Sequence, residues 1–336
     1  RGRMSTALVP RHNLAAAQRS ETVVEGAGGT DPGRVRSLNQ DAFFVGPSQG
    51  RQFIAMVADG MGGHKSGEVA SQKAIEIMRR ELQRSRSQPP VTIARAIQMA
   101  NLDIFDFSVE NREHQGMGTT CTVLVLDDQV GLVGHVGDSR AYLLRAGELR
   151  QLTLDHSWVA DRVRQGILSE EEARQHRWRN VITNTLGSNP QVKLDLLHFQ
   201  VEPGDVLLLC SDGVSMLLST EHMSRILSQH GPAEAAERLL EEANSRGSPD
   251  NVTAVVLRVN AVEERPKKYS LPEGRAFEPA SVALGETLGG VRQVEDQYPA
   301  QDISSRMRRQ PWFQYRYWLL GSLYLILLII MFSLWS

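Results

Sequence analysis

Five aspartates could together form a cluster of carboxylates, and four of them stand at the end or start of a short apolar run, beside glycine or asparagine: Asp41, which follows the run 36–40, and Asp59, Asp138, Asp212 and Asp250. A carboxylate at the end of a buried strand is held on a rigid element, and several together repel one another unless a cation neutralises them. Ligand sets made only of oxygen suit Mg²⁺ or Mn²⁺. Two such ions a few ångströms apart polarise a phosphoryl oxygen and generate hydroxide near neutral pH.

The glycines that follow two of these aspartates leave a second interpretation open. Gly60 and Gly213 could free a backbone carbonyl to turn toward the same ion. Asp-Gly is also the commonest turn dipeptide, so each pair could be only a turn. Spacing along the chain does not bring the five residues together in space.

The elements that must position these residues are short strands and paired helices. Apolar or β-branched runs predict strands at 52–58, 119–126, 130–136, 141–145, 206–210 and 251–259, with hairpin turns at 127–129 and 146–148. Apolar residues at helical spacing predict helices around 70–78, 93–107 and 233–244, and Pro89-Pro90 separates the first two. This pattern predicts an α+β fold of antiparallel sheets covered by helices.

Composition narrows the possible classes. The chain has 336 residues, 41% apolar and 23% charged, with a net charge of −2. An ordinary hydrophobic core is therefore expected. The chain has no excess of basic residues, so its charge does not indicate nucleic acid as a partner. Cys121 and Cys210 lie in apolar runs without the spacing of a zinc site, which predicts two buried core residues.

Four regions follow one another along the chain. We expect a flexible leader at 1–25, a globular catalytic domain at 26–260, a polar linker at 261–310 and a transmembrane anchor at 311–336. Residues 317–336 carry no charge, and in a helix they span about 30 Å. Arginines precede the span and none follows it, which predicts a single-pass protein of the cell membrane with its catalytic domain in the cytoplasm: Arg306, Arg308, Arg309 and Arg316.

Seven motifs in order resemble the metal-dependent protein serine/threonine phosphatase family, protein phosphatase type 2C, in its compact bacterial form. They are Thr-Asp-Pro-Gly-Arg-Val-Arg-Ser-Leu-Asn-Gln-Asp (30–41), Val-Ala-Asp-Gly-Met-Gly-Gly-His (57–64), Gly-Thr-Thr (118–120), Gly-His-Val-Gly-Asp-Ser-Arg-Ala-Tyr (134–142), Leu-Thr-Leu-Asp-His-Ser (152–157), Leu-Cys-Ser-Asp-Gly-Val (209–214) and Ser-Pro-Asp-Asn-Val-Thr (248–253). The resemblance covers about 30–259. It implies two antiparallel β-sheets in a sandwich flanked by helix pairs, with metals at one end.

The resemblance also implies roles for the metal ligands. Asp59 is expected to bridge two Mn²⁺ or Mg²⁺ ions, and Asp212 and Asp250 to complete the first site. The Gly60 carbonyl and Asp41, through water, are expected at the second site. A third and weaker site is implied at Asp138 together with Asp212.

Further expectations concern the substrate. Arg36 stands where the family places its phosphate-binding arginine, and a guanidinium fork suits a phosphate dianion. The implied reaction is attack of metal-bound hydroxide on phosphoserine or phosphothreonine in proteins, opposing a serine/threonine kinase. Gln40 and Met61 replace a metal-binding glutamate and a proton-donating histidine of other members.

Two matters stay open from the sequence. The basic segment 157–190 matches the family's flap region, and it reads equally as a phosphopeptide contact or as a solvated helix face. A catalytically silent module that binds phosphopeptides at the membrane is the alternative to an active enzyme. The five intact aspartates favour activity.

Overall fold

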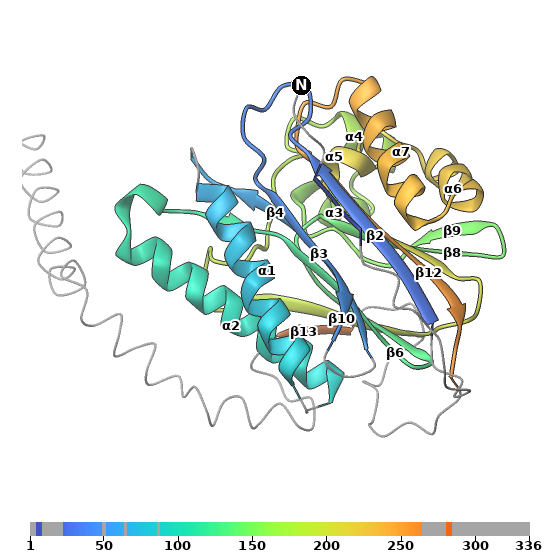
Figure 1. The fold of residues 1–336 in the computed structure, drawn as a ribbon. Helices are drawn as coiled ribbons and strands as arrows, with labels where there is room; N and C mark the ends of the chain where they lie inside the picture. The colour runs from blue at the N-terminus through green and yellow to red at the C-terminus, as the bar shows by residue number, and fades with distance from the viewer. Residues whose placement is uncertain are drawn as a thin grey trace, which may run out of the picture. The chain divides into compact units, whose positions relative to one another are not determined.

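The computed structural model describes residues 5–8, 23–48, 52–63, 66–85, 88–263 and 280–283. The chain divides into two compact units, Arg1–Glu286 and Thr287–Ser336, and all the described residues lie in the first. That unit consists of two antiparallel sheets with helices on their outer faces (Figure 1).

The first sheet has the strand order β1-β2-β12-β11-β8-β9. Its strands are β1 (Ser5–Leu8), β2 (Val23–Asp31), β8 (Arg140–Arg145), β9 (Glu148–Gln151), β11 (Val206–Cys210) and β12 (Val252–Ala261). In the middle of this sheet β12, the last long strand of the globular region, lies between β2, its first long strand, and β11. Side chains far apart in sequence therefore become neighbours, such as Thr30 and Thr253, which are 223 residues apart.

The second sheet has the order β13-β10-β7-β6-β4-β3, and β5 pairs with the end of β4. Its strands are β3 (Asp41–Pro47), β4 (Phe53–Met61), β5 (Gly118–Thr119), β6 (Cys121–Asp127), β7 (Val130–Val136), β10 (Lys193–Gln200) and β13 (Ala280–Ala283). Alternating apolar residues of both sheets pack between them, as in a β-sandwich. Val57 and Leu124 of this sheet meet Leu209 and Val255 of the other in one buried cluster.

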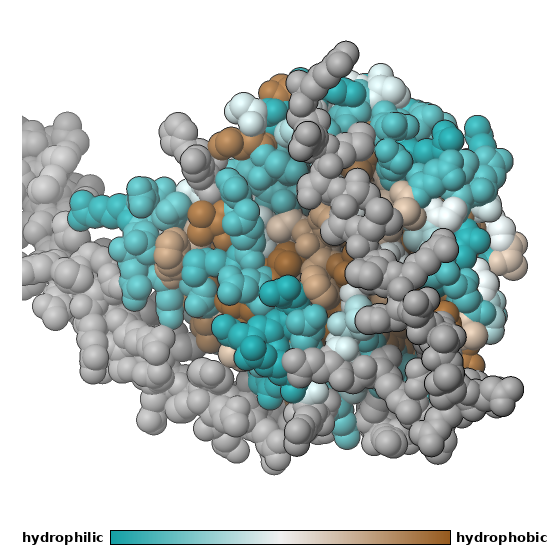
Figure 2. Space-filling view, viewed as in Figure 1, coloured by the Kyte–Doolittle hydropathy of each residue, from teal (hydrophilic) through white to brown (hydrophobic). Residues whose placement is uncertain are grey.

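Helices cover both outer faces. On the second sheet lie α1 (Ser66–Arg84) and α2 (Pro89–Glu110), followed by a short 3-10 turn (Arg112–His114). On the first sheet, α6 (Thr220–Gln229) and α7 (Pro232–Ser245) bury Leu227 and Leu239 against Leu208 and Val256. The shorter helices are α3 (Trp158–Arg164), α4 (Glu170–Gln175) and α5 (Asp212–Ser215). Apolar surface shows at the centre of the face in Figure 2, and hydrophilic surface covers much of the rest.

The predicted architecture of antiparallel sheets and helices is confirmed, with local differences. The strand predicted to end at residue 58 continues to Met61, so Asp59 lies inside β4. The strand predicted at 119–126 is divided into β5 and β6. Segments β1 and β13 are strands where the sequence predicted a leader and a linker. Both cysteines are buried and unpaired, as expected.

The predicted anchor at 311–336 lies outside the described residues. Within the described part of the chain, no helix combines the length and the apolar character that crossing a membrane requires.

Candidate active site

The strand ends and turns of the sandwich bring the five aspartates to one region. Asp41 opens β3 and stands directly opposite Asp59 of β4 in the register of the sheet. Asp138 lies in the turn between β7 and β8, Asp212 begins α5 just after β11, and Asp250 precedes β12. Asp41 and Asp59 belong to the second sheet, Asp212 and Asp250 adjoin strands of the first, and Asp138 lies on the connection between the two, so the region spans both layers.

The electrostatics of this region show how close the carboxylates are. Burial raises the pKa of Asp59 well above its usual value, and the charges of the other four aspartates raise it further. Burial and the nearby Asp212 likewise raise the pKa of Asp138. Burial raises the pKa of Asp41 to about 7 and, together with Asp250, that of Asp212 to about 6. Such crowding of like charges is the situation that a bound cation relieves.

Hydroxyl groups hold Asp41 from one side. Its Oδ2 accepts hydrogen bonds from Ser211 Oγ at 2.8 Å and Thr253 Oγ1 at 2.6 Å. The Ser211 hydroxyl also accepts from the backbone N–H of Thr253 at 3.0 Å, and Thr30 contacts Thr253 at 2.7 Å between hydroxyls. These contacts orient the carboxylate and leave its second oxygen for another partner.

Unsatisfied oxygens provide the test of whether a metal fits here. Asp41, Asp138 and Asp212 each bury one Oδ1 without a hydrogen-bond donor among the described residues. Buried anionic oxygens are costly unless they are paired, and a hard cation is the partner that an all-oxygen set suits. In the part of the chain that the structure describes, no three His, Cys, Asp or Glu side chains are arranged to hold an ion by themselves. An ion here therefore keeps waters or uses backbone oxygens, as Mg²⁺ commonly does.

The glycines of the Asp-Gly pairs allow close contacts between backbones. A Cβ on Gly60 would lie 2.0 Å from the carbonyl oxygen of Gly67 at the start of α1. A Cβ on Gly213 would lie 2.0 Å from the carbonyl oxygen of Asn251. Steric room for a neighbouring segment thus explains both glycines, in addition to any carbonyl that faces an ion.

Arg36 lies beside Asp250. Its Nη2 donates to Asp250 Oδ2 at 2.9 Å, and both side chains are partly exposed. Asn251 fixes the loop that carries Arg36, because its amide donates to the carbonyls of Pro32 and Leu38 and accepts from the N–H of Gln40. The guanidinium therefore lies at the edge of the acidic region and is partly open to solvent.

Sequence reasoning did not assign roles to several supporting residues. Thr119 and Thr120 hold Asp59, since the first donates its hydroxyl to the Asp59 carbonyl and the second accepts from the Asp59 N–H. Ser211, Thr253 and Asn251 likewise act from outside the acidic set. All five residues lie inside the motifs quoted above, and this location is the signal in the sequence that could have pointed to them.

The comparisons with known proteins agree with this geometry. The family model for protein phosphatase 2C matches residues 29–246. The serine/threonine phosphatase stp of Listeria innocua is 34% identical over 241 residues, which cover 70% of this chain and 96% of the relative. The Mycobacterium tuberculosis serine/threonine phosphatase PstP/Ppp superposes with a TM-score of 0.66 at 36% identity, covering 70% and 99% of the two chains.

A second solved structure bears on the metals. The catalytic domain of the serine/threonine protein phosphatase PstP in complex with two manganese ions matches with a TM-score of 0.65 at 35% identity, over 70% of this chain and 98% of that one. The residues that the family model matches include all of the motifs but the last, and four of the five aspartates. The chain belongs to the protein phosphatase 2C family of metal-dependent serine/threonine phosphatases.

Proposed function

We propose that this protein removes phosphate from phosphoserine and phosphothreonine residues of proteins, at the region where the five aspartates meet. The observation that carries the proposal is the set of buried carboxylate oxygens without donors, on Asp41, Asp138 and Asp212. Phosphorylated proteins are the substrates, and a serine/threonine kinase is the expected counterpart. Support comes from the family membership and from relatives named as serine/threonine phosphatases.

Two Mn²⁺ or Mg²⁺ ions are the cofactors that this donor set fits. Asp59, whose pKa the charges of the other four aspartates raise, would help to hold both ions. Asp212 and Asp250 would complete one site, and Asp41 and the Gly60 carbonyl the other, each together with water. When bound, such ions lower the pKa of water and stabilise charge on a phosphoryl group. A third ion is proposed at Asp138 and Asp212, whose mutual repulsion it would reduce.

The protein's own residues orient the substrate and exclude other chemistry. Arg36 is proposed to bind the phosphate dianion, for which its fork geometry is suited. Burial raises the pKa of Cys121 and Cys210 to about 12, so both remain thiols at neutral pH. A cysteine nucleophile is therefore not part of this proposal.

We also propose that residues 317–336 anchor the protein in the cell membrane with the catalytic domain in the cytoplasm. The support is the uncharged sequence and the arginines that precede it. In this arrangement the enzyme acts on phosphoproteins near the membrane surface.

The test is release of phosphate from a phosphothreonine peptide by the full chain. We expect activity to disappear with a chelator and return with Mn²⁺. Asp212→Asn should lower turnover by roughly 1,000-fold, since several kcal/mol of charge stabilisation are lost. Asp103→Asn, which removes an exposed carboxylate paired with Lys73, is the matched control and should retain activity. Turnover that ignores the chelator, or survives Asp212→Asn, contradicts the proposal, and peptide binding without turnover favours the silent module.

A further inference from the structure

The flap segment, residues 157–190, is closed at its base by pairing between its two limbs. The Trp158 N–H donates to the Val181 carbonyl at 2.8 Å, and Thr183 N–H donates to the His156 carbonyl at 2.8 Å. Between these limbs lie α3 and α4, the second begun by a capping box in which Ser169 and Glu172 pair. His156 therefore sits where the flap segment joins the sandwich.

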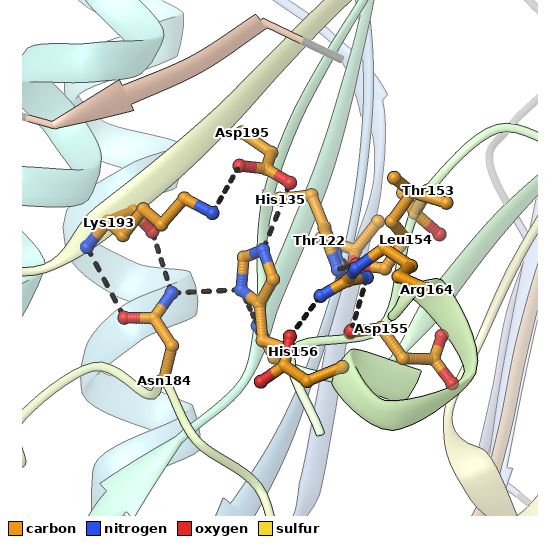
Figure 3. Close-up of polar contacts among 12 residues, drawn as sticks. Thr122, His135, Thr153, Leu154, Asp155, His156, Arg164, Asn184, Lys193 and Asp195 are labelled. Atoms are coloured by element: carbon orange, nitrogen blue, oxygen red, sulfur yellow. Dashed lines mark hydrogen bonds and ion pairs between the residues drawn. The ribbon is translucent and has the colours of Figure 1, made fainter. Parts of the chain in front are cut away.

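The buried imidazole of His156 contacts three separate parts of the fold (Figure 3). Its Nδ1 lies 3.1 Å from the backbone N of Gly137 and 2.8 Å from Asn184 Nδ2. Its Nε2 lies 3.0 Å from Asp195 Oδ2 on β10. One ring thus joins the β7–β8 turn, the returning limb of the flap segment and the second sheet.

These partners determine where the proton of the ring lies. The Asn184 amide is oriented by Lys193, whose carbonyl accepts from Nδ2 at 2.7 Å and whose N–H donates to Oδ1 at 3.3 Å. Asn184 Nδ2 and the Gly137 N–H can only donate, so Nδ1 of His156 is the acceptor. The proton is on Nε2 and is donated to Asp195, as in other carboxylate–histidine pairs that fix a tautomer.

The base of the flap segment touches the acidic region at two points. The backbone N–H of His156 donates to the Gly137 carbonyl at 2.8 Å, and Gly137 directly precedes Asp138. Leu186 exchanges two backbone hydrogen bonds with Thr119, at 3.1 and 2.9 Å. The Thr119 hydroxyl in turn donates to the Asp59 carbonyl at 2.9 Å. A shift at the base would therefore move the flap segment relative to the reacting centre.

Beyond its base, the flap segment exposes surface that a polypeptide can contact. Trp178 is 41% exposed and Ile167 is 61% exposed. Arg177 lies over the ring of Trp178 at 4.7 Å, and Trp158 packs edge-on against the same ring at 4.6 Å. Such a surface could contact the residues that flank a phosphothreonine, a contact that a small aryl phosphate cannot make.

We propose that His156, oriented by Asp195, is a positioning residue that sets the flap segment for protein substrates through its Nδ1 contacts with Asn184 and Gly137. The inference rests on the proposed function and deepens it. His156 itself does not touch the phosphate. Its effect is on the binding of the polypeptide that carries the phosphate.

The experiment compares kcat and KM of the full chain, saturated with Mn²⁺, for a phosphothreonine peptide and for p-nitrophenyl phosphate. Asn184→Ala removes one donor to Nδ1 together with the two contacts to Lys193, and we expect the peptide KM to rise about tenfold, the size of about one net hydrogen bond. The kcat for the peptide and both constants for the aryl phosphate should stay within about twofold. His156→Asn keeps an oxygen acceptor near the place of Nδ1 and should have a smaller effect on KM than His156→Leu.

The matched control is Asn101→Ala. Asn101 is an asparagine with as many hydrogen bonds as Asn184, although it is more deeply buried. It donates to the carbonyls of Asn189 and Pro190 and accepts from the Gly187 N–H, yet it does not contact His156. We expect its peptide KM to change less than about threefold, because the Leu186–Thr119 pairing remains.

Two results would overturn the inference. One is an equal rise in peptide KM for Asn101→Ala and Asn184→Ala. The other is an equal loss on the peptide and on the aryl phosphate, which would mean general loosening of the centre. A wild-type protein that hydrolyses the aryl phosphate but no peptide contradicts the proposed function instead. If His156→Leu does not fold, the comparison of Asn184→Ala with Asn101→Ala still tests the inference.

Discussion

Removing the Thr253 hydroxyl tests whether the support of Asp41 matters for metal binding. Thr253 is fully buried and donates to Asp41 Oδ2 at 2.6 Å, the shorter of the two hydroxyl contacts. Thr253→Val keeps the shape of the side chain and the backbone N–H that contacts Ser211. The substitution therefore removes the hydroxyl contacts with Asp41 and with Thr30.

The magnitude follows from the charge on Asp41. A hydrogen bond to a charged group contributes about 1.5–3 kcal/mol, so its loss destabilises the ionised carboxylate by that amount. The pKa of Asp41, already about 7 because of burial, then rises further. A divalent cation binds the ionised form, so at pH 7 we expect Mn²⁺ to bind about 10- to 100-fold more weakly.

The assay is calorimetric titration of the full chain with Mn²⁺ at pH 7 and at pH 8.5. The deficit should shrink at the higher pH, where the proton no longer competes for the carboxylate. Thr92→Val is the control, because it removes another buried hydroxyl, one on α2 that donates to the carbonyl of the N-cap residue Gln88. Wild-type affinity in Thr253→Val at pH 7, or an equal loss in Thr92→Val, refutes the reasoning.

Three further predictions concern stability and location. Arg145→Met leaves the buried Asp205 without its guanidinium partner and should cost about 3–5 kcal/mol in urea unfolding, whereas the exposed Arg238→Met should cost less than about 1 kcal/mol. Burial lowers the pKa of His135 to about 4, below its value of 6.5 in the unfolded chain. The unfolded chain therefore binds a proton more readily than the folded protein, and the folded protein loses stability as the pH falls from 6.5 through 4. The loss approaches about 3 kcal/mol, and His135→Gln should remove this part of the pH dependence in unfolding titrations; an unchanged slope contradicts it. Deleting residues 311–336 should move the protein from the membrane fraction to the supernatant with peptide turnover within about twofold, and retention on the membrane would disprove the anchor.

Local pattern was sufficient for the elements with strong apolar periodicity. The strands at 130–136 and 206–210 and the helix predicted at 233–244 appear almost as predicted, as β7, β11 and α7. In these segments the residues facing the core recur at the period of the element itself.

Strand β2 escaped prediction because its sequence, Val-Val-Glu-Gly-Ala-Gly-Gly-Thr-Asp, is rich in glycine. In the structure the space beside these glycines is filled from other strands. A Cβ on Gly28 would lie 2.8 Å from the ring of Phe43 and 2.9 Å from Val255. The reason for the glycines therefore lies in segments far along the chain, which no local window contains.

The site divides in the same way. The types and order of the aspartates, and the motifs around them, were enough to indicate divalent cations, phosphate chemistry and the family. Residue types determine which ions and which reactions a set of groups can serve, and these are properties of the sequence itself.

Only the tertiary structure showed which groups support those aspartates. Thr253 and Asp41 are 212 residues apart, and the hydroxyl of one meets the carboxylate of the other because β12 and β3 belong to facing sheets. The tautomer of His156 depends equally on Asn184 and Asp195, which arrive from separate segments. Hydrogen bonds act over about 3 Å, so their partners are decided by packing rather than by distance along the chain.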